Sequence, residues 1–320
     1  MQPVAGPERI MRVPVVPVKS LPAVQTGSPV SGLSFDQGAI LKETVADIRS
    51  RLGSRIADLT VERVVIGIFF TGVKLSNGSG GLCFTPIKEI PEAVCCPSSL
   101  RASPWTGKFR GRPVEDFIET LFDKSPIKRT IGIAVLNALS ASCWEQAPPE
   151  LYSIERGSDA LETIEIPDDA NVVVIGALVP ILLRLRKRGK PFSIIEMDPR
   201  TLKADEMPFW VPVERTAEVV PKADLLVITG TSLLFHSLEP ILSAAKKGAE
   251  IIVVGPTASM LPGAFFRRGV TVLGGDLVTR PDDLLDILSE GGSGYHFFGK
   301  SADRIIIRNT GPENRMKRGC

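Results

Sequence analysis

Three stretches of the sequence decide the fold. Residues 171–176 read NVVVIG, residues 223–232 read ADLLVITGTS, and residues 250–259 read EIIVVGPTAS. Each is a short run of β-branched and aliphatic residues that ends at a glycine-bearing turn. Continuous apolar strands of this kind are typical of a parallel sheet that is covered on both faces.

Segments with helical periodicity separate these strands, so strands and helices alternate along the second half of the chain. This alternation predicts an α/β fold in which a Rossmann-like parallel sheet domain occupies residues 149–307. The predicted strands are 171–175, 192–195, 223–228, 250–254 and 270–273, and the predicted helices are 179–188, 238–247 and 281–288.

A smaller α+β domain is predicted to precede it, over residues 35–148. The run Ala147-Pro148-Pro149 marks the boundary between the two domains. The predicted helices of this domain are 36–52, 113–122 and 126–143, and its strands are 61–70 and 81–85, with a turn at Asn77-Gly78. Outside the domains we predict a flexible, proline-rich lead-in over 1–34 and a basic tail over 308–320.

The composition narrows the function classes. The chain has 320 residues, with 38 Lys and Arg against 36 Asp and Glu, a formal net charge of +2. No global field therefore favours nucleic acid or an acidic membrane as a partner. The five cysteines lack regular spacing, no signal peptide is visible, and the longest apolar stretch, residues 172–183, is too short to span a bilayer. These features predict a cytoplasmic protein, and they leave homo-oligomerisation open.

The strand ends are the predicted ligand site, because ligands of open parallel sheets bind at the carboxyl ends of the strands. Glycine allows a ligand to approach the backbone closely, and N–H groups at helix starts favour anions. Such turns also need Gly, Ser and Thr for capping alone, but the recurrence of these residue types at several strand ends favours a ligand site. The candidate residues are Gly176, Glu196, Thr229, Gly230, Thr231, Ser232, Gly255, Pro256, Thr257 and Ser259; the stretch Gly274-Gly-Asp276 lies at a further strand end.

Dinucleotide binding is the alternative. Glu196 stands 20 residues after Gly176, at the spacing of an acid that binds a ribose, but the G-x-G-x-x-G fingerprint is missing. The alternative function is therefore a nucleotide- or cofactor-dependent transferase or oxidoreductase that uses the Rossmann-like domain.

Three further positions invite a functional interpretation. Asn137 lies in an apolar helix, where its amide either ties down a neighbouring loop or points into a cleft towards a ligand. His236, beside a predicted helix start at Ser237, is either a metal ligand or proton shuttle, or an exposed loop residue. Cys95-Cys96 is either a soft-metal site, as in a metallochaperone, or a pair of buried small residues.

The chain resembles the heavy-metal chelation proteins, a family of domains of unknown function. The resemblance rests on an ordered set of stretches: GIAVLNAL at 132–139, VIG at 174–176 with Pro180, IE at 195–196, TGTSL at 229–233 and GPTASMLP at 255–262. It implies an enolase-N-terminal-like domain followed by a Rossmann-like domain, with a site in the cleft between them.

The resemblance further implies that Asn137 lies at this cleft, and that the protein handles a transition or heavy metal or a metal-chelating small molecule. Because His and regularly spaced Cys are scarce, we expect a small anionic or metal-bearing ligand in place of coordination by protein atoms alone. His236 is the candidate metal ligand. The sequence decides neither the reaction nor whether there is one.

Overall fold

A computed structural model of the chain describes residues 38–90, 105–147 and 151–310. The predicted lead-in over 1–34, the Cys95-Cys96 pair and the boundary at Pro148 lie outside these residues. In the part that is described, no helix is both long and apolar enough to cross a membrane.

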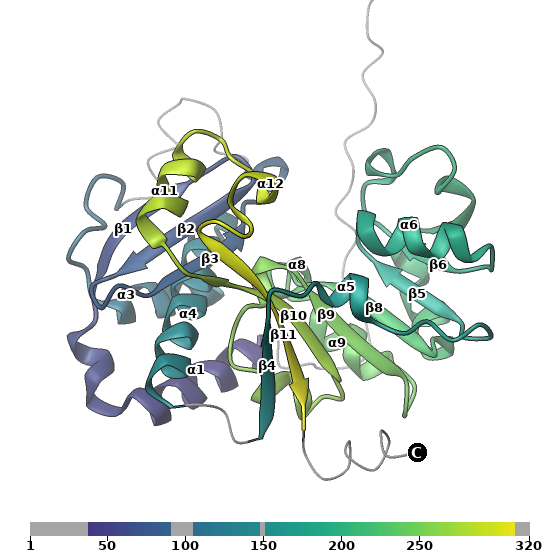
Figure 1. Cartoon of the computed structure of the whole chain (residues 1–320), viewed down its shortest axis with the longest axis horizontal. Helices are drawn as coiled ribbons and strands as arrows, with labels where there is room; N and C mark the ends of the chain where they lie inside the picture. Colours follow the sequence, from purple (N-terminus) through teal and green to yellow (C-terminus); the bar gives the residue numbers. More distant parts are fainter. Residues whose placement is uncertain (1–37, 91–104, 148–150, 311–320) are drawn as a thin grey trace, which may run out of the picture. The chain divides into compact units, whose positions relative to one another are not determined.

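An eight-stranded sheet forms the larger layer (Figure 1), in the order β4-β11-β10-β9-β8-β5-β6-β7. The six strands from β10 to β7 run parallel to one another, and β11 pairs antiparallel with both β10 and β4. Taken in chain order, the six parallel strands have the 3-2-1-4-5-6 arrangement of a Rossmann fold. The strands are β4 (Tyr152–Arg156), β5 (Val172–Ile175), β6 (Ser193–Ile195), β7 (Trp210–Val211), β8 (Leu225–Thr229), β9 (Glu250–Val254), β10 (Val272–Val278) and β11 (Ala302–Asn309).

Alternate residues of the strands enter two different cores, so both faces of this sheet are covered. Val172 and Val174 of β5 belong to one core, while Val173 and Ile175 belong to the other. This burial explains why the strands read as unbroken apolar runs. The helices that flank this sheet are α5 (Ala160–Thr163), α6 (Val179–Arg188), α7 (Thr216–Val219), α8 (Thr231–Leu234), α9 (Leu238–Ala244) and α10 (Gly263–Phe266).

A three-stranded antiparallel sheet, in the order β1-β2-β3, forms the smaller layer. Its β3 packs so closely on the long helix α4 that a Cβ built on Gly81 would lie 2.1 Å from the carbonyl oxygen of Ala134. Only glycine fits at this contact. The elements of this part are α1 (Ala39–Leu52), β1 (Val61–Ile66), β2 (Phe70–Leu75), β3 (Gly80–Phe84), α3 (Val114–Ile118) and α4 (Pro126–Gln146).

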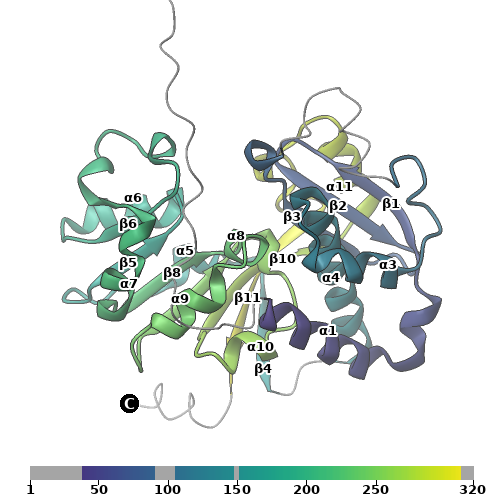
Figure 2. The ribbon, with the colours of Figure 1, turned by 180° about the vertical axis from the view of Figure 1, so that it is seen from behind.

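The other face of the small sheet is covered by residues from the end of the chain (Figures 1 and 2). Helices α11 (Pro281–Ser289) and α12 (Gly294–Phe297) lie between β10 and β11 in the chain, and α11 packs on β1 and β2. Leu82 of β3 shares a core cluster with Leu284 and Leu288 of α11. The helix predicted at 281–288 is therefore present, but it packs on the small sheet and not on the large one.

Among the predicted strands, those at 61–70 and 270–273 differ most from the structure. The run 61–70 is not one strand, because Gly67 donates its N–H to the Phe70 carbonyl 3.0 Å away and turns the chain between β1 and β2. The strand predicted at 270–273 continues to Val278, because β11 pairs with it along its whole length. Short 3-10 helices complete the fold: η1 (Gly53–Asp58), η2 (Ile87–Glu89), η3 (Glu119–Phe122), η4 (Pro199–Thr201), η5 (Met207–Phe209), η6 (Val213–Arg215), η7 (Val220–Lys222) and η8 (Pro256–Ala258).

Candidate functional site

The predicted residues at the ends of β5 and β8 lie together, at the point where the strand order reverses. Gly176 has a φ of 97°, and a Cβ at this position would lie 2.9 Å from Thr229 Cγ2. The Thr229 and Thr231 hydroxyls are 3.1 Å apart. Gly230 donates its N–H to the Val254 carbonyl 2.6 Å away, and Ser232 is only 4 % exposed. Of this group, Gly176, Thr229 and Thr231 are partly exposed, whereas Gly230 and Ser232 are buried.

Both carboxylate oxygens of Glu196 accept hydrogen bonds from backbone N–H groups. One oxygen accepts the Ala177 N–H at 2.9 Å, and the other accepts the Asp198 N–H at 3.0 Å. The carboxylate thus fixes the turns after β5 and β6. It also occupies the N–H group at the turn where a dinucleotide fold receives its phosphate. This geometry disfavours a ribose-binding role for Glu196 and, with it, the dinucleotide alternative.

The hydroxyls of the turn after β9 also serve the protein itself. Thr257 Oγ1 accepts the Phe84 N–H at 3.2 Å, and Ser259 Oγ accepts the Asp276 N–H at 2.8 Å. Gly255 donates its N–H to the Gly274 carbonyl 2.8 Å away. These side chains and N–H groups hold the turn in place, so they shape the sheet edge and are not themselves displayed to a ligand.

Asn137 joins the small sheet to this same turn. Its Nδ2 donates to the carbonyl oxygens of Leu82 at 2.7 Å, Pro256 at 2.9 Å and Thr257 at 3.3 Å. The side chain is 2 % exposed, and its Oδ1 is buried without a hydrogen-bond partner. These contacts agree with the interpretation that the Asn137 amide holds a neighbouring loop in place, one of the two that the sequence allows.

His236 lies away from the strand ends, in the contact between α8 and the start of α1. It has a φ of 53°, and a Cβ built on Gly38 would lie 3.6 Å from its Nδ1. Nδ1 is buried and unpartnered. Burial, with the nearby Arg129 guanidinium, lowers the pKa of this imidazole and so favours the neutral ring. A cation next to the ring is unfavourable for a metal, and a metal role for His236 stays a prediction.

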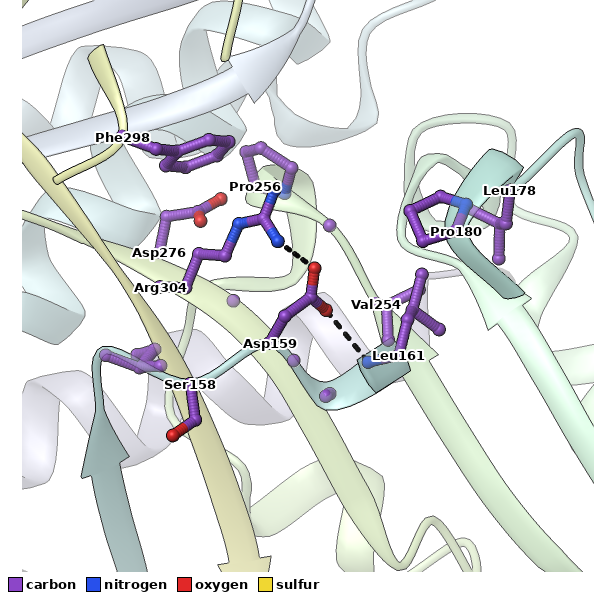
Figure 3. Close-up of a pocket in the computed structure, with 15 residues that line it drawn as sticks. Ser158, Asp159, Leu161, Leu178, Pro180, Val254, Pro256, Asp276, Phe298 and Arg304 are labelled. Carbon is purple, nitrogen blue, oxygen red and sulfur yellow. Dashed lines mark hydrogen bonds and ion pairs between the residues drawn. The ribbon is translucent and has the colours of Figure 1, made fainter. Parts of the chain in front are cut away.

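A pocket opens beside these turns, where residues 274–276 of β10 pass the carboxyl end of β9 (Figure 3). It has a volume of about 160 Å³. Three charged residues lie in it: Asp159 at the start of α5, Asp276 in β10 and Arg304 in β11. Its other lining residues are Ser158, Ala160, Leu161, Leu178, Pro180, Val254, Gly255, Pro256, Gly274, Gly275, Phe298 and Ile305.

The Asp159–Arg304 pair forms the fixed part of the pocket. Asp159 accepts a hydrogen bond from Arg304 Nη1 and, through its other oxygen, one from the Leu161 N–H at 2.8 Å. The Arg304 guanidinium carbon lies 4.7 Å from the centroid of the Phe298 ring. Ion pairing and stacking together hold this guanidinium in one orientation.

Asp276 is the unsatisfied group of the pocket. It stands directly opposite Arg304 in the β10–β11 ladder, and it is 7 % exposed. Its Oδ2 is buried and has no hydrogen-bond partner. Burial raises the pKa of this carboxyl to about 7, against the attraction of Arg304 and with the repulsion of Asp159. A buried carboxyl that titrates near neutral pH in a pocket is typical of a functional site.

Sequence reasoning placed Asp276 at a strand end but gave it no role. Its burial follows from pairing with β11, a strand that the sequence analysis did not predict. The local sequence offers no signal for this environment, because Arg304 stands 28 positions further along the chain than Asp276.

The protein groups around the pocket do not make a complete metal site. Within residues 38–90, 105–147 and 151–310, no group of three or more His, Cys, Asp or Glu side chains is placed to hold a metal ion. Burial raises the pKa of the Cys83 thiol to about 12 and that of Cys143 to about 11, so both are protonated. Soft-metal binding needs thiolates.

Comparison with known proteins identifies relatives of both halves. The family models DUF4213 and DUF364 match residues 49–140 and 159–307, and both carry the description "Putative heavy-metal chelation". The chain is 28 % identical, over 195 residues, to an uncharacterized protein of Methanocaldococcus jannaschii; the match spans 59 % of this chain and 69 % of that protein.

Two solved structures of unknown function from the DUF364 family share the fold. The protein from Pyrococcus horikoshii is 20 % identical with a TM-score of 0.64, over 84 % of this chain and 99 % of that one. The protein from Desulfitobacterium hafniense is 18 % identical with a TM-score of 0.62, over 86 % of this chain and all of that one. These likenesses confirm the predicted α/β fold class. With both family models matched in order, the chain belongs to the heavy-metal chelation family that the sequence resemblance indicated.

Proposed function

We propose that this protein binds a small organic ligand that carries a heavy metal, in the pocket formed by Asp159, Asp276 and Arg304. The observation that carries the proposal is the Asp276 carboxyl, which is buried in the pocket with an unpartnered oxygen. Burying such a group without a partner is costly, so an unpartnered carboxylate oxygen in a pocket is a candidate contact for a ligand.

The location supports the proposal. The pocket lies at the carboxyl ends of the parallel strands, where open α/β sheets bind ligands. Its lining residues all come from residues 158–305, so the site belongs to the larger sheet and borders the small one through Pro256. This refines the sequence-based expectation of a cleft lined by both domains.

The size and the donor set support a metal-bearing small molecule over a bare metal ion. A volume of about 160 Å³ is below the roughly 300–1,000 Å³ of a drug-sized ligand pocket. The pocket therefore admits a small molecule or one end of a larger one. Since the described residues supply no set of three metal ligands, the organic ligand supplies the chelating atoms in this proposal.

The test is to identify what the protein carries when it is purified from its native host without chelators. Elemental mass spectrometry gives the metal per chain, and native mass spectrometry gives the mass of any bound organic molecule. We expect a heavy metal and an organic mass that leave together on denaturation. Arg304→Gln should lose both, whereas the control Arg280→Gln, in an exposed pair with Asp283, should retain both. Metal without an organic mass, or full retention in Arg304→Gln, would contradict the proposal.

A further inference from the structure

We infer that the ligand presents an N–H or O–H donor to Asp276, and not a carboxylate or phosphate. The inference rests on the proposed function in one respect only, namely that the pocket binds a small molecule. The first observation behind it is the unpartnered Oδ2 of Asp276, a carboxyl that is 7 % exposed. A donor from the ligand would satisfy Oδ2 of the ionised carboxylate, whereas a second acceptor would leave it unpaired.

Two donors close to the Asp276 carboxyl, its own N–H and Arg304 Nη1, are directed at other acceptors, so neither of them satisfies Oδ2. The Asp276 N–H points to Ser259 Oγ, 2.8 Å away. The neighbouring Arg304 donates to Asp159 and stacks on Phe298. In Figure 3 the Asp276 carboxyl lies between the Phe298 ring and the Arg304 side chain, and the dashed lines lead from Arg304 to Asp159 and on to Leu161.

The charges of the pocket favour the same class of head group. Two carboxylates, Asp159 and Asp276, face one guanidinium, Arg304, so the pocket carries one net negative charge when Asp276 is ionised. These are the charged groups that act on Asp276 from α5 and β11. An anionic head group would be repelled, while a neutral or cationic donor would be attracted. This argues against the anionic ligand that the glycine-bearing turns suggested.

The walls of the pocket restrict the size and the polarity of the part of the ligand that carries the donor. Phe298 and Pro256 lie near the charged groups, and Leu178 and Pro180 lie on the other side of the pocket (Figure 3). An apolar cavity of about 150 Å³ is large enough to bind benzene. The present volume, about 160 Å³, therefore suits a single small ring that carries its donor at the edge.

The pKa of Asp276 should change when a ligand binds, and the direction of the change can be measured. Burial raises the pKa of this carboxyl to about 7. A cationic or N–H donor at Oδ2 stabilises the ionised form and lowers this pKa, whereas a bound anion raises it further. The direction of the change thus reports the class of head group.

Three molecules of nearly the same shape serve as probes: benzamidine, which is a cationic donor, neutral benzamide, and anionic benzoate. Their binding to the full chain is measured by NMR at pH 8, where Asp276 is mostly ionised, and the Asp276 carboxyl is followed in protein labelled with ¹³C-aspartate. We expect benzamidine to bind at least about tenfold more tightly than benzoate, with benzamide between them. Benzamidine should also lower the pKa of Asp276.

The variant Asp276→Asn removes the charge and keeps the shape of the side chain. In this variant the preference for benzamidine over benzoate should fall to about threefold or less. The control Asp58→Asn changes an exposed aspartate outside the pocket and should keep the full preference.

Two results would overturn the inference. One is benzoate binding as tightly as benzamidine in the wild-type protein, with a rise in the pKa of Asp276. The other is the absence of binding by all three probes. The first result leaves the proposed function intact, because the pocket still binds a small molecule. The proposed function fails separately, if the metal and organic mass carried by the purified protein do not depend on Arg304.

Discussion

Asn137 Nδ2 and the carbonyl oxygen of Pro256 are joined by a hydrogen bond of 2.9 Å, between a helix that packs on the small sheet and a turn that lines the pocket. The two residues are 119 positions apart in the sequence. The same amide holds Leu82 of β3. One side chain thus connects both sheets to the ligand site.

Replacing Asn137 with alanine should destabilise the protein by about 1–3 kcal/mol, because buried carbonyls lose their donor. It should also weaken binding of benzamidine, since Pro256 is freed on the side facing away from the pocket. Urea unfolding followed by circular dichroism measures the stability. Asn171→Ala is the matched control, because Asn171 donates to the Lys222 carbonyl at an exposed site. An Asn137→Ala protein as stable as this control would show that the bridge does not matter.

Asp276→Asn should stabilise the protein, and increasingly so as the pH rises. The pKa of this carboxyl is about 7 in the folded protein, against an ordinary value of 3.8. The folded state therefore holds the proton more tightly, and stability is lost as the pH rises from about 4 to 7. Relative to the wild type, Asp276→Asn should gain on the order of 2–4 kcal/mol at pH 8 and little at pH 4.

Thermal and urea unfolding at several pH values between 4 and 8 check this second prediction. The difference between the two proteins is the measured quantity, because the contributions of distant carboxyls cancel in it. A difference that does not change with pH would mean that Asp276 is ionised throughout this range.

Glu43 should contribute stability that disappears in acid. It accepts hydrogen bonds from Arg268 and Arg267, which join α1 to the end of α10, and these lower its pKa from 4.5 to about 2. The stabilisation is complete above about pH 4.5 and is lost as the pH falls towards 2. Because the Glu43 side chain is 37 % exposed, Glu43→Gln should cost only about 0.5–1 kcal/mol at pH 7.

Measuring the free energy of unfolding at pH 7 and at pH 2.5 tests whether the contribution of Glu43 to stability is lost in acid. The wild type and Glu43→Gln should differ at the first pH and converge at the second. Glu115→Gln, which removes an exposed pair with Arg49, shows how much a single surface pair contributes. A cost for Glu43→Gln that persists at pH 2.5 would assign the effect to packing.

Glu196→Ala should lower stability without changing any affinity for NAD. The carboxylate holds the N–H groups of Ala177 and Asp198, and the loss of these two charge-assisted bonds should cost about 1–3 kcal/mol. Isothermal titration with NAD and NADH, beside urea unfolding, separates the two effects. Tight nucleotide binding that vanishes in Glu196→Ala would restore the dinucleotide alternative.

The large sheet could be predicted from the sequence because its strands are buried on both faces. Runs such as EIIVV at 250–254 have no other simple interpretation, and β9 occupies those residues. The antiparallel strand β11 was not predicted because its segment ADRIIIRN is apolar only in the middle. Without β11, neither Arg304 nor the burial of Asp276 could be anticipated.

Of the residues that the sequence predicted for the ligand site, Gly255 and Pro256 line the pocket, and the role of the predicted set stays a prediction. The glycines and hydroxyls at the strand ends do gather at one edge of the sheet, as parallel topology requires. Sequence could not show that the Thr257 and Ser259 hydroxyls are used by Phe84 and Asp276. Hydrogen bonds between residues far apart in the chain depend on tertiary packing, which cannot be inferred from the neighbouring residues in the sequence.

The position of α11 and α12 also has a consequence for how the chain is made. The small sheet is complete in sequence by Phe84, yet the leucines that cover its second face lie at 284–288, about 200 positions later. On a ribosome, this hydrophobic surface stays exposed until nearly the whole chain has emerged. We therefore expect nascent chains that stop near residue 150 to depend on chaperones, and the protein to acquire protease resistance in a single late step.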